Sequence, residues 1–479
     1  MTPTLAALCT YMLVQLGIGV WVSRRIRTED DYFLAGRQLG YPLAIFSIFA
    51  TWFGAETIVG SAGRASREGV SLSSAEPFGY GLCLILMGLV FAGPLWRRKL
   101  TTLADLFRTR YSTGVERLAA VILIPSSILW AAAQVRAFGY VLTIGSSLDV
   151  TAAVAIAAGF TILYTAFGGL LADAITDLIQ GVLLVVGLMV VLVAVVVHLG
   201  GVDAAATAVL GSDRIRLAGT GGASVMDVLE AWAIPVCGSV VATELVSRVI
   251  ATRSPQVARR SAFAAGGLYL AVGLIPVFIG LVGAGIVPEL QDAEQLVPAT
   301  ARQLLPTLLY AVFAGGLISA ILSTVDSTLL VSAGLLSHNL VVPLLGATEE
   351  RTKVRVARLG VLVFGIIAYV LALHAEGVFA LVEQASAFGS AGALVTIVFG
   401  LFTTVGGART AGATLLVGVV AYVGGLVAAL PHPFLTSLAA ALATFGLGAA
   451  LERLGGVEKR RRGEASRGGV ATSSLDAFP

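Results

Sequence analysis

The sequence predicts an all-α membrane protein with thirteen transmembrane helices, and three observations support this prediction. Hydrophobic residues make up 57% of the 479 residues and charged residues only 12%, about half the charged fraction of a soluble protein. Apolar runs of about 20 residues, long enough to cross a bilayer as a helix, recur along the whole chain. Basic residues gather in the short segments between these runs rather than on one nucleic-acid-binding face.

Each apolar run is expected to form one helix, the first being a retained helix and not a cleaved signal. The thirteen segments are 4–22, 42–62, 75–95, 117–144, 150–167, 174–198, 227–249, 261–286, 304–337, 355–374, 378–403, 411–429 and 433–451.

The placement of Lys and Arg predicts the orientation of the chain in the inner membrane. With the N-terminus outside and the C-terminus in the cytoplasm, 24 of the 31 basic residues are cytoplasmic. The polar tail, 453–479, is expected to be disordered.

Two predicted helices contain interruptions at membrane depth. Phe53–Thr57 brings a glycine and a carboxylate into one helix, and Ile234–Gly238 brings a proline and a glycine into another. Each alone would suggest an ordinary kink. Interruptions five segments apart, however, are typical of transporters built from two inverted five-helix repeats, in which unwound backbone lines a cavity.

Polar residues inside the apolar segments indicate an ion site. Ser323 and Thr324 offer adjacent hydroxyls, and the Ala320 carbonyl lies on the same helix face. Such oxygens with few carboxylates suit a monovalent cation, although hydroxyls can also bond back to their own helix. Asp177 and Gln180 share one face of another helix, and a carboxylate there needs a partner: either a cation or the free amides of a helix start.

Aromatic residues suggest how a solute could bind. Trp52, Tyr80 and Trp130 lie in helices expected to meet, and aromatic faces attract substituted ammonium groups. Each ring could instead face lipid headgroups.

The sequence offers no sign of an enzyme or an ATP-driven pump. The four histidines lie at segment ends, and there is no phosphate-binding Gly-Lys-Ser/Thr loop. We therefore expect no cofactor besides the coupling ion.

Six short motifs in order resemble the sodium:solute symporter family. They occupy residues 31–37, 49–56, 102–108, 164–169, 176–180 and 322–327. The resemblance implies thirteen helices with a leucine-transporter-like 5+5 inverted-repeat core, alternating access, and symport of a small solute with sodium across the lipid bilayer. It also implies a sodium site made of the carbonyls of Ala50, Phe53 and Ala320 and the hydroxyls of Ser323 and Thr324, with Asp177 close by.

Within that family the chain is similar to the choline-transporter branch around Trp52, Tyr80 and Trp130. Ala242 stands where that branch has a fourth aromatic residue, and Glu244 lies nearby. The resemblance therefore implies an amine-bearing or zwitterionic solute, choline-like or proline-like. Glu56 matches a solute-binding position, but Thr57 after it departs from the sugar branch. A sugar, a monocarboxylate or a non-transporting sensor remains an alternative, and the oligomeric state is left open.

These expectations divide the chain into six parts. They are an extra N-terminal helix and loop (1–30), a first repeat (31–198), an external loop (199–226), a second repeat (227–403), two C-terminal helices (404–452) and the tail (453–479).

Overall fold

The computed structural model describes residues 3–24, 26–145, 149–211, 214–216, 224–288, 290, 292–375 and 377–468, with side chains in all of these except 3–9, 11, 12, 19, 144, 145 and 455–468. The elements of the first half are α1 (Pro3–Ser23), α2 (Glu29–Leu34), η1 (Ala35–Arg37), α3 (Tyr41–Trp52), η2 (Glu56–Gly60), α4 (Ser61–Glu68), β1 (Val70–Ser71), α5 (Phe78–Leu86), η3 (Met87–Phe91), α6 (Ala92–Arg97), α7 (Ala104–Arg110), α8 (Thr113–Gly145), α9 (Val150–His198), α10 (Val202–Leu210) and β2 (Ile215–Arg216).

In the described part of the second half, every named element is a helix. Its elements are α11 (Val225–Ala233), η4 (Ile234–Gly238), α12 (Thr243–Ile250), α13 (Pro255–Gly283), η5 (Ala293–Gln295), α14 (Leu296–Leu304), α15 (Thr307–Gly334), η6 (Leu335–Val341), α16 (Val342–Leu345), α17 (Glu350–His374), α18 (Val378–Ala387), α19 (Ser390–Phe402), α20 (Ala408–Val427) and α21 (Pro433–Gly468).

Ten helices within the described ranges are long and apolar enough to cross a membrane, and an eleventh span results if the bent pair Tyr41–Trp52 and Glu56–Glu68 is counted as one. The prediction of thirteen differs at two places. In α1 only Leu13–Ser23 qualifies, as a shorter apolar helix. The predicted segments 150–167 and 174–198 form the single 49-residue element α9.

A bend at Gly169 explains how α9 fits a bilayer. A straight helix of this length would measure about 74 Å, more than twice the roughly 30 Å of a hydrocarbon core. Gly169 has φ 60° and ψ 177°, a conformation that interrupts the helix and is open mainly to glycine. The bend therefore divides α9 into two parts of membrane length.

The two interrupted helices are joined by backbone contacts at both of their ends. Before α3, the Leu39 amide donates to the Ala251 carbonyl (3.2 Å), and the Arg253 amide donates to the Leu39 carbonyl (3.1 Å). After α4, β1 pairs in parallel with β2, which precedes α11, with Val70 opposite Ile215. The helices α3–α4 and α11–α12 are thus tied together by their connecting segments.

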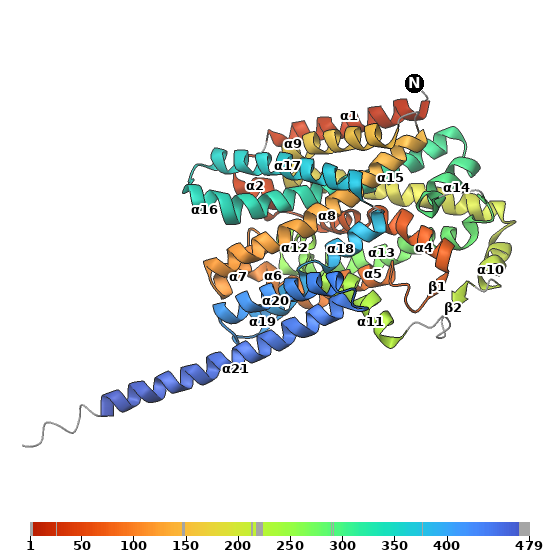
Figure 1. Cartoon of the computed structure of the whole chain (residues 1–479). Coiled ribbons are helices and arrows are strands. Elements are labelled where there is room, and N and C mark those ends of the chain that lie inside the picture. The colour runs from red at the N-terminus through yellow and green to blue at the C-terminus, as the bar shows by residue number, and fades with distance from the viewer. Residues whose placement is uncertain are drawn as a thin grey trace, which may run out of the picture.

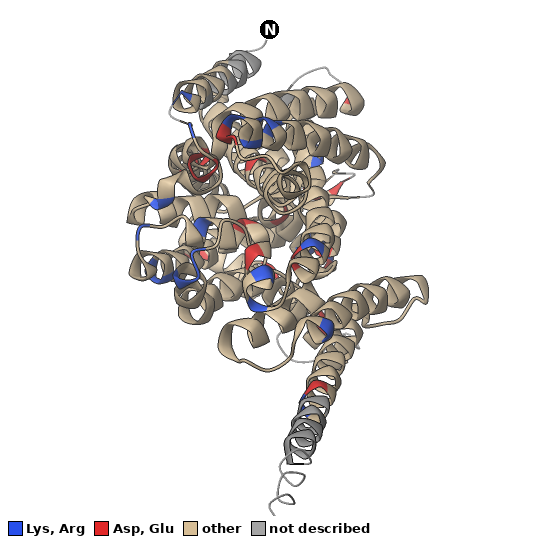
Figure 2. Ribbon diagram, turned by 90° about the vertical axis from the view of Figure 1, so that its left-hand side faces the viewer, with Lys and Arg blue, Asp and Glu red and all other residues tan. Residues whose placement is uncertain are grey.

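The two ends of the bundle differ. The elements α2, α7 and α16 lie at one end, whereas α4, α10, β1 and β2 lie at the other (Figure 1). The start of α1 and the far end of α21 lie at opposite ends of the bundle. Figure 2 looks onto the end with α2 and α7 and shows Lys and Arg on its connecting segments. This is the end to which the sequence assigned the cytoplasmic loops.

The last helix differs from the prediction of a disordered tail. α21 continues to Gly468 and extends beyond the bundle, so the backbone of 453–468 is helical (Figure 1). The rest of the predicted tail, 469–479, lies outside the described residues.

We expect Gly169→Ala to destabilise the protein by roughly 1–3 kcal/mol, because alanine is strained at this backbone conformation. Its Cβ would also lie 2.9 Å from Tyr32 Cδ2 and 3.0 Å from the Tyr32 carbonyl oxygen. Thermal unfolding of the purified protein in detergent measures the loss. Gly159→Ala is the control, because a Cβ there, on the same helix, meets nothing within 4 Å. Equal melting temperatures for the two variants would contradict this explanation of the bend.

Candidate functional site

The first interruption is stabilised by a side chain of α8. α3 ends at Trp52, and the next helix begins at Glu56 with an axis turned by 56°. Gln134 Oε1 accepts a hydrogen bond from the Ala55 amide (2.9 Å), and Gln134 Nε2 donates to Glu56 Oε2 (2.7 Å). A Cβ on Gly54 would lie 2.5 Å from Glu56 Oε2, so a larger residue at this position would displace the bond between Gln134 and Glu56. Glu56, a predicted solute residue, is thus fully buried and held against α8.

The second interruption packs on α18. The π-helix η4 ends at Gly238, and α12 starts at Thr243 after four non-helical residues. A Cβ on Gly238 would collide with the Ser386 carbonyl oxygen of α18. Both interruptions predicted from the sequence are therefore present, each with a glycine at a close approach.

Hydroxyl groups and one carboxylate bring α3, α9 and α15 together. Ser47 donates to Asp177 Oδ2 (2.6 Å), and Ser323 donates to Asp177 Oδ1. The Thr324 hydroxyl lies 3.0 Å from the Thr51 carbonyl of α3 and 3.1 Å from the Ala320 carbonyl of its own helix. The predicted ion-site residues of α9 and α15 therefore do meet.

The carbonyl of α3 in contact with these groups belongs to Thr51. Ala50 and Phe53, whose carbonyls the resemblance assigned to the site, are its buried near neighbours. Gln180, which was predicted to share a helix face with Asp177, lies three residues after it in α9. Neither polar atom of the buried Gln180 side chain has a hydrogen-bond partner in the described part of the chain.

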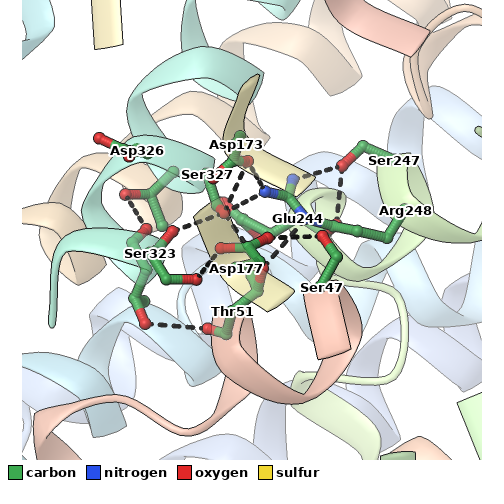
Figure 3. A network of polar contacts seen from close by, with 12 residues as sticks. Ser47, Thr51, Asp173, Asp177, Glu244, Ser247, Arg248, Ser323, Asp326 and Ser327 are labelled. Carbon is green, nitrogen blue, oxygen red and sulfur yellow. Dashed lines mark hydrogen bonds and ion pairs between the residues drawn. The ribbon is translucent and has the colours of Figure 1, made fainter. Parts of the chain in front are cut away.

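A buried ion pair at the centre of this network was missed by the sequence analysis. Arg248 of α12 is 0% exposed, and its Nη2 contacts Asp173 Oδ2 and the Ser327 hydroxyl (Figure 3). Its Nε donates to Thr51 Oγ1 (3.0 Å), and its Nη1 donates to Ser247 Oγ (3.0 Å). One guanidinium thus contacts α3, α9, α12 and α15. The available signal was a basic residue near the end of the predicted segment 227–249 and an acidic residue beside the predicted segment 174–198, since charges at membrane depth pair.

The predicted aromatic residues form one cluster. The ring centroids of Trp52 and Trp130 are 5.4 Å apart, and those of Tyr80 and Trp130 are 6.1 Å apart. The Tyr80 hydroxyl lies 2.9 Å from Ser386 Oγ. Both indole N–H groups are buried without a hydrogen-bond partner among the described residues. The cluster leaves little space, because the adjoining cavity has a volume of only about 10 Å³.

The residues near the missing fourth ring take different positions. Ala242 lines the small cavity together with Trp130 and Ser386. Glu244 accepts a hydrogen bond from Ser127 of α8, one turn before Trp130, and is buried. A carboxylate therefore lies at the edge of the aromatic cluster, bound to the helix that carries Trp130.

Another acidic residue near the first interruption was not predicted. Glu76 Oε1 accepts a hydrogen bond from the Tyr269 hydroxyl (2.9 Å), which in turn contacts the Thr57 hydroxyl. This contact gives Thr57 a polar partner in α13. No motif signalled Glu76, and its partner Tyr269 is 193 positions away in the sequence.

Charged groups also close the end of the bundle that carries α2 and α7. His338 Nδ1 lies 3.0 Å from Glu29 Oε1, and its Nε2 lies 3.2 Å from Asp105 Oδ1. Burial alone would raise the pKa of Asp105, but His338 and the amides of Thr102 and Thr101 outweigh it and hold that pKa below its usual value. These contacts of His338 join η6 to α2 and α7 at this end of the bundle.

Comparisons with known proteins identify the family. The model of the sodium:solute symporter family matches residues 32–418. High-affinity choline transporter 1 of Caenorhabditis elegans is 25% identical (79% of this chain, 70% of that protein), and its Homo sapiens counterpart is 27% identical (79% and 69%). The sodium/pantothenate symporter of Escherichia coli is 24% identical (70% and 71%).

Solved structures share the fold. A sodium-coupled sialic acid symporter in a substrate-bound, outward-open state superposes with a TM-score of 0.82 at 18% identity, covering 94% of this chain and 98% of that one. Mhp1, a nucleobase-cation-symport-1 family transporter, superposes with a TM-score of 0.60 at 15% identity, covering 88% of this chain and 94% of that one. The fold is therefore that of the leucine-transporter-like transporters.

We expect Arg248→Met to cost about 3–5 kcal/mol in stability, because it leaves Asp173 as an uncompensated buried charge. Adding Asp173→Asn should restore part of that loss, so the double variant unfolds at a higher temperature than Arg248→Met alone. Arg136→Met is the matched control, since the Arg136 guanidinium donates to the Ala372 carbonyl rather than to a carboxylate. The stability losses caused by Arg136→Met and Asp173→Asn should be additive in the double variant. Additive losses for Arg248 and Asp173 would argue against the ion pair.

Proposed function

Because the chain belongs to the sodium:solute symporter family, we propose that it carries a small amine-bearing or zwitterionic solute into the cell together with sodium, by alternating access. The family consists of sodium-coupled transporters, not enzymes. We place the protein in the inner membrane with its N-terminus outside and its C-terminus in the cytoplasm, as the distribution of basic residues favours.

The proposed sodium site uses the carbonyls of Ala50, Phe53 and Ala320 and the hydroxyls of Ser323 and Thr324, with Asp177 supplying negative charge. Its support is the convergence of α3, α9 and α15 on these oxygens. The Thr324 hydroxyl already bridges the Ala320 and Thr51 carbonyls at 3.1 and 3.0 Å. An array of neutral oxygens with one nearby carboxylate matches the preference of a small, hard, singly charged cation.

The proposed solute site is the aromatic cluster of Trp52, Tyr80 and Trp130, and this cluster is the observation that carries the amine assignment. The ring centroids of Trp52 and Tyr80 lie 5.4 and 6.1 Å from that of Trp130, and aromatic rings gathered in this way suit a cationic group. We assign Glu244 and Ala242 to the open side of the cluster and Glu56 to the polar part of the solute. Choline-transporter relatives favour the same chemistry.

A second candidate is a carboxylate or sugar solute. The pantothenate symporter among the relatives favours the carboxylate. The Glu56–Gln134 pair favours hydroxyl groups, which it could bind directly. A sensor on the same scaffold is a further alternative.

Uptake into proteoliposomes tests the function. Choline, betaine, proline, a sugar and a monocarboxylate are offered with an inward sodium gradient, and choline-like or proline-like solutes should accumulate only when sodium is present. Equal uptake after replacing sodium with potassium would overturn the symport proposal. Accumulation of only the sugar or the monocarboxylate would overturn the amine assignment and leave symport intact.

We expect Ser323→Ala and Thr324→Val each to raise the sodium concentration for half-maximal uptake by roughly tenfold, about 1.4 kcal/mol, because each removes one ligand oxygen. Ser332→Ala is the control on the same helix, since its hydroxyl bonds only to the Thr328 carbonyl in the residues described. Unchanged sodium dependence in the Ser323–Thr324 double variant would move the site elsewhere.

Replacing Trp52 should affect solute affinity in proportion to the ring face lost. A cation–π contact of about 0.5–2 kcal/mol predicts a rise of roughly 2- to 30-fold in the half-saturating solute concentration for Trp52→Ala, and a smaller one for Trp52→Phe. Sodium binding should be retained, because α3 contributes only backbone carbonyls to the proposed sodium site. Trp232→Phe, which removes an indole bonded to the Leu72 carbonyl, should leave affinity unchanged. Equal affinity for Trp52→Ala and wild type would exclude the cluster as the solute site.

A further inference from the structure

We propose that an anionic phospholipid of the cytoplasmic leaflet binds in an open pocket between η3 and α13, where Arg259 and Arg260 hold its phosphate. None of the lining residues belongs to the sequence motifs or to the proposed ion and solute sites. The inference goes beyond the proposed function and rests on it only for the orientation in the membrane, which places the start of α13 on the cytoplasmic side.

The pocket has the size of a ligand site. It is lined by Gly88, Leu89, Gln256, Arg259, Arg260 and Phe263, and its volume is about 490 Å³. Pockets that hold small molecules typically measure roughly 300–1,000 Å³. The cavity beside the aromatic cluster, at about 10 Å³, is far smaller. The pocket therefore has room for a lipid headgroup and the first part of its acyl chains.

A close approach of the two helices forms one wall of the pocket. A Cβ on Gly88 would lie 2.7 Å from the Arg259 carbonyl oxygen and 2.8 Å from the Phe263 amide nitrogen, so the backbones of η3 and α13 are in contact there. A Cβ on Gly93 of α6 would lie 3.4 Å from Cδ of Arg259, so the aliphatic stem of this arginine packs on α6. Packing of the stem restricts the positions that the guanidinium can take.

The two arginines of the pocket lack a protein counter-charge. Both are exposed, and neither side chain takes part in an ion pair or a hydrogen bond among the described residues. The sequence has no Asp or Glu in 245–288, which includes all of α13, or in 77–104, which includes α5, η3 and α6. A basic pocket between membrane helices on the cytoplasmic side favours an anionic headgroup.

The exposed face of α13 changes from polar to apolar within one turn. Gln256 and Arg260 are exposed, and so are Phe263 (52%) and Leu274 (48%) further along the helix. Leu89, which lines the pocket with Phe263, is 55% exposed. Exposed apolar side chains of a membrane helix face acyl chains. The pocket therefore lies where lipid headgroups meet the hydrocarbon core.

Trp96 marks the same level on the neighbouring helix α6. Its Nε1 donates to the Thr252 carbonyl (2.7 Å), three residues before α13 begins. The Lys99 ammonium lies 3.7 Å from the centroid of its ring. Because tryptophan is enriched at the level of lipid headgroups, this contact supports the same depth for the start of α13.

The chemistry of the pocket favours a phospholipid over a second copy of the chain. A symmetric interface would bring the arginines of one copy against those of the other, and like charges repel. A phosphodiester accepts paired N–H bonds from a guanidinium. The acyl chains of the same molecule would lie along Leu89 and Phe263. One lipid thus satisfies both the basic and the apolar part of the pocket.

Native mass spectrometry of the purified full-length protein in detergent, without sodium or solute, tests the inference. Wild type should bind phosphatidylglycerol roughly 25-fold more tightly than phosphatidylcholine with the same acyl chains, at about fivefold for each arginine. Arg259→Gln combined with Arg260→Gln should abolish this preference. Arg351→Gln combined with Arg355→Gln is the control, because it removes the same charge from two exposed arginines of α17 and should keep the preference.

Two further variants separate loss of charge from loss of folding. Arg259→Lys combined with Arg260→Lys keeps both charges and should retain most of the preference. Elution as a single symmetric peak from size-exclusion chromatography confirms folding. If the double glutamine variant fails that criterion, Arg260→Gln alone replaces it and should lower the preference about fivefold.

The outcomes that overturn the proposal are distinct. Equal affinity of wild type for the two lipids, an unchanged preference in the glutamine variants, or an equal loss in the α17 control excludes this pocket as the lipid site. Displacement of the lipid by excess inorganic phosphate or glycerol 3-phosphate would identify a soluble phosphate compound as the ligand instead. A wild-type dimer that the glutamine variants dissociate would make the pocket an interface between copies. Sodium symport is unaffected by any of these results, because uptake is not measured.

Discussion

The contact between the buried Arg248 guanidinium and the buried Asp173 carboxylate is the constraint on which the centre of this protein depends. At membrane depth neither charge can turn to water, so each needs a partner on another helix. Arg248 of α12 contacts three other helices through Asp173, Ser327 and Thr51. The contact therefore sets the spacing between the first interruption, α9 and α15, and with it the position of the hydroxyls and carbonyls of the proposed ion site.

The hydroxyl groups around this pair allow the site to exist with or without an ion. A serine or threonine hydroxyl that donates its proton keeps lone pairs with which to bind a cation. Thr324 can donate to a carbonyl, and Ser323 donates to Asp177, so neither group is unsatisfied when no ion is present. Loading the proposed site thus requires small shifts of oxygen atoms rather than refolding of a helix.

Local patterns in the sequence predicted much of this arrangement, and long-range contacts account for the rest. The glycines and proline of the interruptions, the paired hydroxyls of α15, Asp177 and the three rings all stand out inside apolar segments. The Arg248–Asp173 pair joins residues 75 positions apart, and a single sequence does not specify such pairing. Glu76 was missed for the same reason, because only the fold brings Tyr269 to it.

The helix count shows a second kind of limit. Apolar length predicted the two parts of α9 as separate helices, whereas one residue with positive φ lets the chain turn without a loop. The extension of α21 to Gly468 was missed. A polar composition indicates that a segment cannot form a packed core, but it does not exclude a helical backbone.

The backbone ties between the two interrupted helices restrict how the molecule can open. Sliding one helix along the other would break the Leu39–Ala251 and Val70–Arg214 hydrogen bonds together, whereas rotation of the two as one body breaks neither. Thr324 and Asp177 belong to helices outside this pair, while the Thr51 carbonyl belongs to it. A rotation would lengthen the 3.0 Å separation between Thr324 Oγ1 and the Thr51 carbonyl oxygen. A sodium ion at the proposed site would oppose that rotation, so binding and release of the ion would be coupled to the side of the membrane on which the bundle is open.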